Sequence, residues 1–431
     1  MSMLQLETID LKKILYQVER KKFNYHVKSP ISLEYSSGPM IYSEIYLNII
    51  TIWLMGERIN TQFMLLLAIC QVLYVICNIG SDTVHSLDYE EKYNFGTMLG
   101  FRFHLIFVAF FLGFNFLLLN GYLDKMYYLA LFLVIMSDKA LEAFARCCEA
   151  EFARKDKQIR NMPSIIYRQF FPLAVYALML IFTRDILIAY GLSVIMKLPF
   201  VFFFDFFVIN HKKKIHWRYQ PHMTAKILAD ALPDFIPSIS CSLLLYVPRI
   251  VIGLTMGGKY LSCYQECFIL AQIIFQLIYL LVRPKIDNIK KMWSEGKYEI
   301  CKKNIVTFTA AIGFITMVSV ILLSMLGPGL LRVLFSDAFA GSNYVLYWFA
   351  AALGLRLLNM EMYFVLVIRN AGVLAAIIRT ACAVMIIIVS VQLIPGSKII
   401  TSAAIYAIGR ATECVLLCVC AGIRKLGVSH K

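Results

Sequence analysis

The stretch that decides the fold is LPDFIPSISCSLLLYVPRIVIGLTMGGKY, residues 232–260. It is apolar over a length sufficient for a helix that crosses a bilayer, which needs about 20 residues. It also contains three prolines, an aspartate and Arg249. A proline removes a helical hydrogen bond, and an intramembrane arginine is energetically costly. Such a helix is tolerated only where its freed backbone groups and its arginine face other protein or a water-filled cavity.

The composition of the whole chain is also that of a membrane protein. Of its 431 residues, 60% are hydrophobic and 16% are charged, and its mean hydropathy is +0.71. A soluble globular protein is about 45–50% apolar and about 25% charged. We therefore predict an all-α, polytopic membrane protein. The twelve cysteines are scattered without a CxxC pair, so we expect them to be reduced and mostly buried.

Apolar runs of membrane-spanning length recur along the chain and predict about 12 transmembrane helices. They lie near residues 40–55, 63–80, 97–120, 126–146, 165–183, 186–209, 229–254, 260–282, 304–330, 343–368, 371–393 and 400–423. The basic loop 211–228 has six runs on each side. This division predicts two six-helix bundles, 40–210 and 229–431, around a central cavity. Residues 1–39 are predicted to form a cytoplasmic, amphipathic N-terminal segment.

The distribution of lysine and arginine orients these spans. With both termini in the cytoplasm, the predicted cytoplasmic loops carry 21 of these residues and the external loops carry six. Positive charge concentrates on the cytoplasmic side of membrane proteins. The net charge of +15 therefore indicates topology and contact with anionic membrane lipids, and we expect no nucleic acid partner.

Arg102, Lys197, Arg249 and Arg356 are basic residues inside predicted spans, and each lacks an acidic neighbour at helical spacing. Each must face either an acid on another helix or a polar cavity, because lipid does not accommodate it. As a cavity wall, the four would bind an anionic substrate. The sequence leaves both alternatives open. Pro233, Pro237 and Pro248 are the candidate hinge residues of the span that contains Arg249.

Other intramembrane charges have potential partners on their own helix. Asp138, Glu142 and Arg146 lie one turn apart, and Arg410 and Glu413 can pair in the same way. Arg168 lies near a predicted helix end, from which its side chain can reach the interface.

Two further residues are candidates for coupling transport to an ion. His104 is the only histidine inside a predicted span and could titrate near physiological pH, although a packing role is the alternative. Asp205 lies near the cytoplasmic end of the sixth span and could help to bind a cation. The chain has no P-loop and no catalytic constellation, so we expect no enzyme, no cofactor and no bound metal.

The segment from residue 228 to 310 carries a distinctive series of features. In order, they are Leu232-Pro233, Arg249, Gly257-Gly258, Tyr264, Ala271-Gln272, Arg283-Pro284 and the basic run SEGKYEICKK. This series resembles the polysaccharide-exporter family of O-antigen-type flippases, in the multidrug/oligosaccharidyl-lipid/polysaccharide flippase superfamily. Pro248 departs from that pattern, because the family tends to have an acid before the arginine.

The resemblance implies a flippase of the bacterial cytoplasmic (inner) membrane. Such a protein moves an undecaprenyl-pyrophosphate-linked oligosaccharide from the inner to the outer leaflet by alternating access, for O-antigen, capsule or exopolysaccharide assembly. The implied partners are the lipid-linked oligosaccharide, membrane lipids, and the polymerase and chain-length machinery of the same pathway. The alternatives are a small-molecule cation or drug exporter of the same superfamily, a membrane glycan polymerase, and a receptor or channel.

Overall fold

The computed structural model describes most of the apolar part of the chain. The described residues are 45–55, 57–86, 88, 92–122, 125–155, 162–210, 221–294, 297–335, 343–368 and 371–423. The predicted N-terminal segment 1–39 lies outside them, as do residues 211–220 of the predicted basic linker and the basic tail from Arg424.

Helices form almost all of the described chain, as the apolar runs predict. A short apolar helix, Ile45–Met55, precedes the labelled elements. These are α3 (Glu57–Asn78), α4 (Ser81–Ser86), α5 (Phe95–Leu119), α6 (Met126–Arg154), α7 (Met162–Thr183), α8 (Ile186–Pro199), the π-helical turn η2 (Phe200–Phe206), α9 (Phe207–Asn210), α10 (Pro221–Thr255), α11 (Gly258–Ser294), α12 (Tyr298–Leu334), α13 (Asn343–Ile368), α14 (Gly372–Leu393) and α15 (Ile399–Ile423).

Ten helical stretches in the described residues are long and apolar enough to cross a membrane. Together with Ile45–Met55 and α6, they account for all twelve apolar runs in the sequence. The second half of α6 is rich in charged residues, which lie buried against its neighbours. The prediction of an all-α, polytopic membrane protein is confirmed.

Several helices extend further than the apolar runs predict. α6 continues to Arg154, and α10 begins at Pro221. α11 and α12 cover most of residues 283–303, which lie between the eighth and ninth predicted spans. Hydropathy marks only the part of a helix that lies in hydrocarbon. Lysine, arginine and glutamate are good helix formers, so the helices continue through the charged segments that hydropathy assigns to loops.

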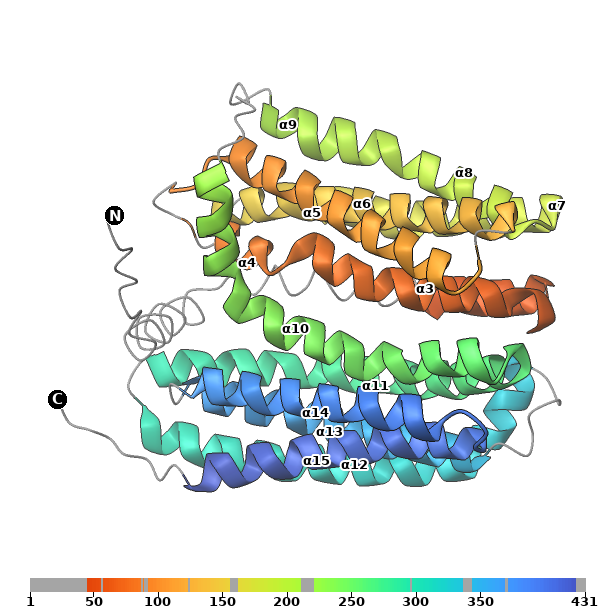
Figure 1. Cartoon of the computed structure of the whole chain (residues 1–431). Coiled ribbons are helices and arrows are strands. Elements are labelled where there is room, and N and C mark those ends of the chain that lie inside the picture. The colour runs from red at the N-terminus through yellow and green to blue at the C-terminus, as the bar shows by residue number, and fades with distance from the viewer. Residues whose placement is uncertain are drawn as a thin grey trace, which may run out of the picture.

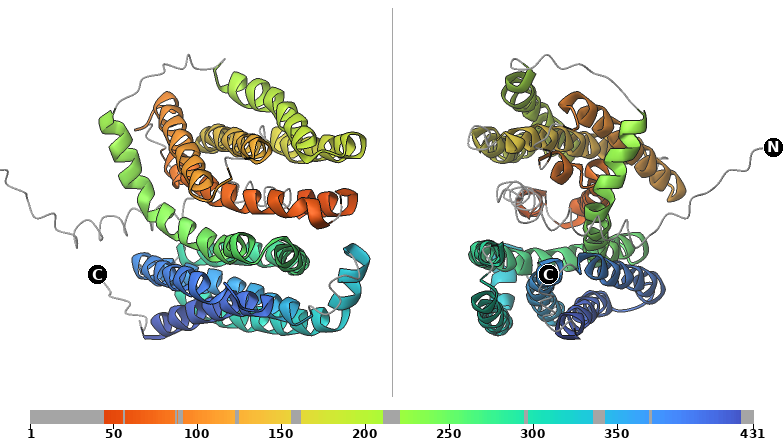
Figure 2. Two further views of the ribbon diagram at one scale, coloured as in Figure 1. Left: turned by 45° about the vertical axis from the view of Figure 1, so that its right-hand side comes forward. Right: turned by 90° about the vertical axis from the view of Figure 1, so that its left-hand side faces the viewer.

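The helices form two groups with α10 between them. Figure 1 shows α3 to α9 on one side and α11 to α15 on the other. α10 packs against α14 of the second group and against α3 of the first. The first turns of α10 run at a steep angle to the rest of the helix (Figures 1 and 2). Pro233, Pro237 and Pro248 all lie inside this helix, where proline favours bending.

Close contacts join the first group to α10 at one end of α3 and to the second group at the other. At one end, Gly80 has φ of 65°, and a Cβ there would lie only 2.9 Å from the carbonyl oxygen of Ala231. At the other end, a Cβ on Gly258 would lie 2.8 Å from Thr61 Oγ1. Trp53 Nε1 also donates to the carbonyl oxygen of Leu334. Glycine at positions 80 and 258 therefore allows a close approach that a larger residue would prevent.

An ion pair joins the first group to α10 beside Gly80. Lys92 Nζ lies 3.0 Å from Asp230 Oδ2, and the Tyr93 hydroxyl donates to the same oxygen at 2.8 Å. Burial opposes the charge of Lys92, but its hydrogen bonds to Tyr93 and Asp230 outweigh this and raise the pKa of Lys92. The contribution of this pair is thus present at physiological pH and is lost only as the pH rises through the raised pKa.

Candidate functional site

Two of the four predicted cavity cations are held in ion pairs between helices. Arg102 on α5 is 1% exposed and donates to Asp82 and Asn78. Lys197 on α8 pairs with Asp138 of α6, and the Tyr190 hydroxyl donates to Asp138 at 2.9 Å. An anion could reach either cation only by competing with the carboxylate that already pairs with it. The structure therefore places Arg102 and Lys197 in the paired arrangement that the sequence left open.

Arg168 lies deep among the helices of the first group. Its side chain is completely buried, pairs with Glu149 and lies 3.4 Å from Asp205. The prediction that it reaches the interface is wrong, because two carboxylates on neighbouring elements draw it inward. Asp205 lies on η2, the π-helical turn that follows Pro199. A coupling cation at Asp205 would have to compete with this guanidinium.

The second candidate for ion coupling, His104, lies on an exposed part of α5. Its Nδ1 is 2.7 Å from the carbonyl oxygen of Gly100, one turn earlier on the same helix. The buried charge pairs of the first group therefore lie on a different side of α5 from this ring.

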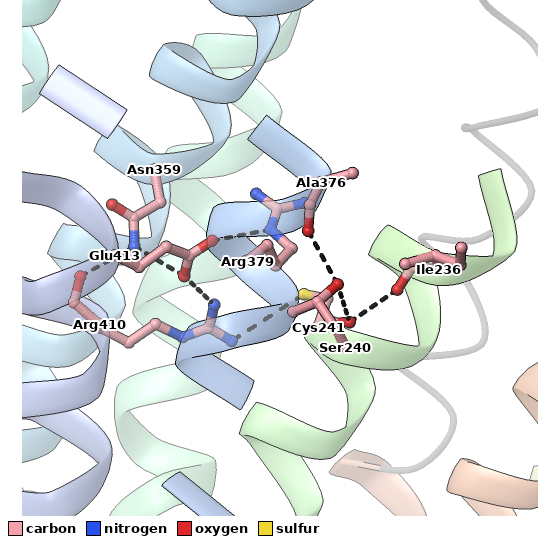
Figure 3. A network of polar contacts seen from close by, with 9 residues as sticks. Ile236, Ser240, Cys241, Asn359, Ala376, Arg379, Arg410 and Glu413 are labelled. Atoms are coloured by element: carbon pink, nitrogen blue, oxygen red, sulfur yellow. Dashed lines mark hydrogen bonds and ion pairs between the residues drawn. The ribbon is translucent and has the colours of Figure 1, made fainter. Parts of the chain in front are cut away.

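The second group contains a buried polar network centred on Glu413 of α15 (Figure 3). Arg379 Nε donates to Glu413 Oε1 at 2.7 Å, and Arg410 Nη1 donates to Oε2 at 2.9 Å. Asn359 Nδ2 donates to the same oxygen at 3.0 Å. The predicted pairing of Arg410 and Glu413 is confirmed, and Arg379 of α14 joins it from another helix.

The network extends to Cys241 of α10, where Arg410 Nη2 lies 3.9 Å from Cys241 Sγ. Arg356, Arg379 and Glu413 lie near enough to this sulfur to interact with it electrostatically. We call Arg356, Arg379, Arg410 and Glu413 the cationic cluster. These four side chains comprise three guanidiniums and one carboxylate, so their formal charges sum to +2.

A small cavity with a mixed lining adjoins Arg356 of the cationic cluster. Its volume is about 50 Å³, and it is lined by Asn48, Gln265, Gln272 and Arg356 together with apolar and aromatic side chains. Arg356 Nη1 is 3.4 Å from Gln272 Oε1, and its guanidinium lies over the Phe275 ring. These neighbours are neutral. The buried Gln265 Oε1 accepts no hydrogen bond within the described part of the chain.

The predicted anion-binding residue Arg249 lies behind two aromatic rings that line this cavity. Its side chain is 1% exposed, and its guanidinium lies 5.0 Å from the centre of the Tyr246 ring and 4.7 Å from that of Phe268. Both rings line the cavity, as does Arg356. The structure thus places Arg356 in the lining of this cavity and Arg249 against two of its lining rings, whereas Arg102 and Lys197 lie in the first group.

Sequence reasoning omitted Arg379 from the candidate site and treated Arg410 as neutralised by Glu413. A signal for Arg379 was present, since no acid lies one turn away from it on its own helix. Among the described residues, no cluster of three or more His, Cys, Asp or Glu side chains could hold a metal ion.

No family model matches the sequence, and no curated protein matches it at a significant level. Solved structures do match. An inward-facing multidrug resistance MATE family transporter of the MOP superfamily gives a TM-score of 0.61 at 12% identity, over 95% of this chain and 97% of that one. The outward-facing form gives 0.59 at 12%, over 97% and 98%. The chain has the fold of these transporters.

A third structure with this fold is a MOP superfamily transporter from Pyrococcus furiosus. It gives a TM-score of 0.59 at 11% identity, over 97% of this chain and 98% of that one. For that protein, a reverse polarity of the binding pocket was taken to suggest a different function. At such low identity, these similarities establish the fold alone.

Proposed function

We propose that the protein is a flippase that moves a lipid-linked oligosaccharide with a pyrophosphate linkage across the membrane. The observation that carries this proposal is the cationic cluster, which contains three guanidiniums and one carboxylate and places Arg356 at a small cavity. Guanidinium groups bind phosphate oxygens through two parallel hydrogen bonds, a geometry that lysine lacks. A pyrophosphate would supply the negative charge that the cluster lacks.

The cargo sets physical requirements that this site can meet. Sugar hydroxyls and phosphates cannot cross hydrocarbon without hydrogen-bond partners, because each unpaired polar group costs several kcal/mol. The amides of Asn48, Gln265 and Gln272 line the cavity and can bind hydroxyl groups. Opening this cavity between the two helix groups would admit a sugar larger than the space described here.

The proposed transport cycle follows from the division of the fold. We take residues 40–210 and 229–431 as two six-helix bundles that rock about α10, with Pro233, Pro237 and Pro248 as the hinge. The protein would lie in the bacterial inner membrane with both termini in the cytoplasm, as its lysine and arginine distribution indicates. Polymerase and chain-length proteins of the same pathway would take over the cargo on the outer side.

The main alternative is an exporter of small cations within the same fold. Such a protein needs acidic or aromatic groups at its binding site, because a cation is repelled by like charge. The excess of arginine in the cationic cluster favours an anion instead. The different function suggested for the Pyrococcus furiosus transporter on the basis of its pocket polarity supports using pocket charge as a guide within this fold.

The proposal predicts that cells lacking this gene accumulate lipid-linked repeat units and lose the corresponding surface glycan. Lipid extraction and mass spectrometry measure the first quantity, and surface polymer analysis measures the second. Complementation with the wild-type gene should restore both. A normal lipid pool with normal surface glycan, in a strain without a second exporter, would contradict the proposal and favour the small-molecule exporter.

A further inference from the structure

A large apolar groove lies between α10 and α14, outside the cavity described above. Its volume is about 910 Å³, and Thr380 is the one polar residue among those that line it. Both helices are candidate membrane spans. Ile377 and Val384, which line the groove, are 59% and 49% exposed, so the groove is open at the protein surface. We call it the α10–α14 groove.

Small residues give this groove its depth. Ala229 and Pro233 line it on α10, and Gly372, Ala376 and Ala381 line it on α14. The lining residues on α14 extend from Gly372 to Val389, which corresponds to about 26 Å at 1.5 Å per residue. This length approaches the thickness of the hydrocarbon core, about 30 Å. The groove therefore has the shape and chemistry to hold a long hydrocarbon chain.

The groove and the cationic cluster use neighbouring residues of α10 and α14. Thr380 lines the groove, and its Oγ1 lies 3.0 Å from the buried Ser240 Oγ of α10. The next residue on α10 is Cys241 and the preceding residue on α14 is Arg379, and both belong to the network around Glu413. The same short segments of α10 and α14 thus contribute to the apolar groove and to the arginine cluster.

From this juxtaposition we propose that the α10–α14 groove binds the polyprenyl chain of a phosphate-linked lipid while its phosphates engage the cationic cluster. This inference rests on the proposed function and adds a second binding region, the α10–α14 groove, to the cationic cluster. Charge complementarity selects the occupant: a neutral lipid would leave the excess arginine charge unmatched, whereas a phosphate-bearing chain satisfies both regions at once.

The inference is tested with the full-length protein in vesicles of phosphatidylethanolamine and phosphatidylglycerol. The probe is a polyprenyl pyrophosphate that carries a photoreactive group in its chain, and mass spectrometry locates the crosslinked peptide. We expect crosslinks on α14. Ala381→Trp, which fills the groove, should lower their yield at least fivefold, and Ala376→Phe should do the same. Val391→Trp is the control, since Val391 is 57% exposed and lies outside the groove lining.

A further variant, Arg356→Gln, separates this inference from the proposed function. Loss of probe retention in Arg356→Gln, together with unchanged chain crosslinking in Ala381→Trp and Ala376→Phe, would overturn the groove and leave the flippase proposal standing. Absence of saturable probe binding by the wild-type protein would overturn both. Displacement of the probe from the groove by excess phosphatidylglycerol would also overturn the inference, because the occupant would then be bulk phospholipid.

Discussion

Oxidation of a Thr61→Cys/Gly258→Cys double variant should stop transport almost completely, and reduction should restore it. A Cβ on Gly258 lies 3.1 Å from Thr61 Cβ, slightly closer than the ~3.5–4.5 Å between the Cβ atoms of a disulfide. A small backbone adjustment therefore permits the bond. The bond would join α3 of one helix group to the start of α11 in the other. If the groups must separate at this end to release cargo, the crosslink holds them closed.

The measurement is leaflet translocation in reconstituted vesicles before and after oxidation. Each single-cysteine variant serves as a control for the native cysteines, which the structure leaves as free thiols and mostly buried. These variants should lose little activity on oxidation. Full transport by a quantitatively crosslinked double variant would contradict rocking of the two groups at this contact.

Arg168→Gln should lower the stability of the protein, whereas Arg356→Gln should leave stability nearly unchanged and slow transport. Both variants remove an arginine from the membrane interior. Arg168 is completely buried between Glu149 and Asp205. Its removal leaves buried carboxylates without their cation, which typically costs about 3–5 kcal/mol. Arg356 is half-buried beside the neutral Gln272 and Phe275. Its replacement should change the free energy of unfolding by less than about 1 kcal/mol.

Transport, unlike stability, should depend strongly on Arg356. We expect the Arg356→Gln variant to fold normally and to lose at least tenfold in transport rate, whereas Arg168→Gln should show a lowered Tm and reduced yield. Thermal unfolding of the purified variants and translocation per folded molecule measure the two effects. A stable Arg356→Gln variant that transports at the wild-type rate would remove Arg356 from the binding site.

Much of this fold is predictable from local sequence, but most of the charge pairing is not. Every apolar run became a helix. A single segment surrounded by hydrocarbon can pair all its backbone N–H and C=O groups only by forming a helix. Arg410 and Glu413 could be paired in advance since both lie one turn apart on one helix. Arg102 could not be assigned to Asp82, because that contact depends on how α5 packs against α4.

Arg168 and Arg379 illustrate the same limit. Position near a predicted helix end suggested that Arg168 reaches the interface, whereas tertiary packing surrounds it with carboxylates. Arg379 gains its role through Glu413 on a different helix. Sequence alone identifies an intramembrane charge as costly, and only the three-dimensional arrangement shows whether the protein or a ligand would satisfy it.

The most direct test of the flippase proposal is reconstitution of the purified protein in vesicles loaded asymmetrically with a fluorescent polyprenyl-pyrophosphate-linked oligosaccharide. Wild-type protein should move the lipid between leaflets, the Arg356→Gln variant should be at least tenfold slower, and a small organic cation should not compete. Movement indistinguishable from protein-free vesicles, together with efflux of the cation, would contradict the proposal and identify a cation exporter.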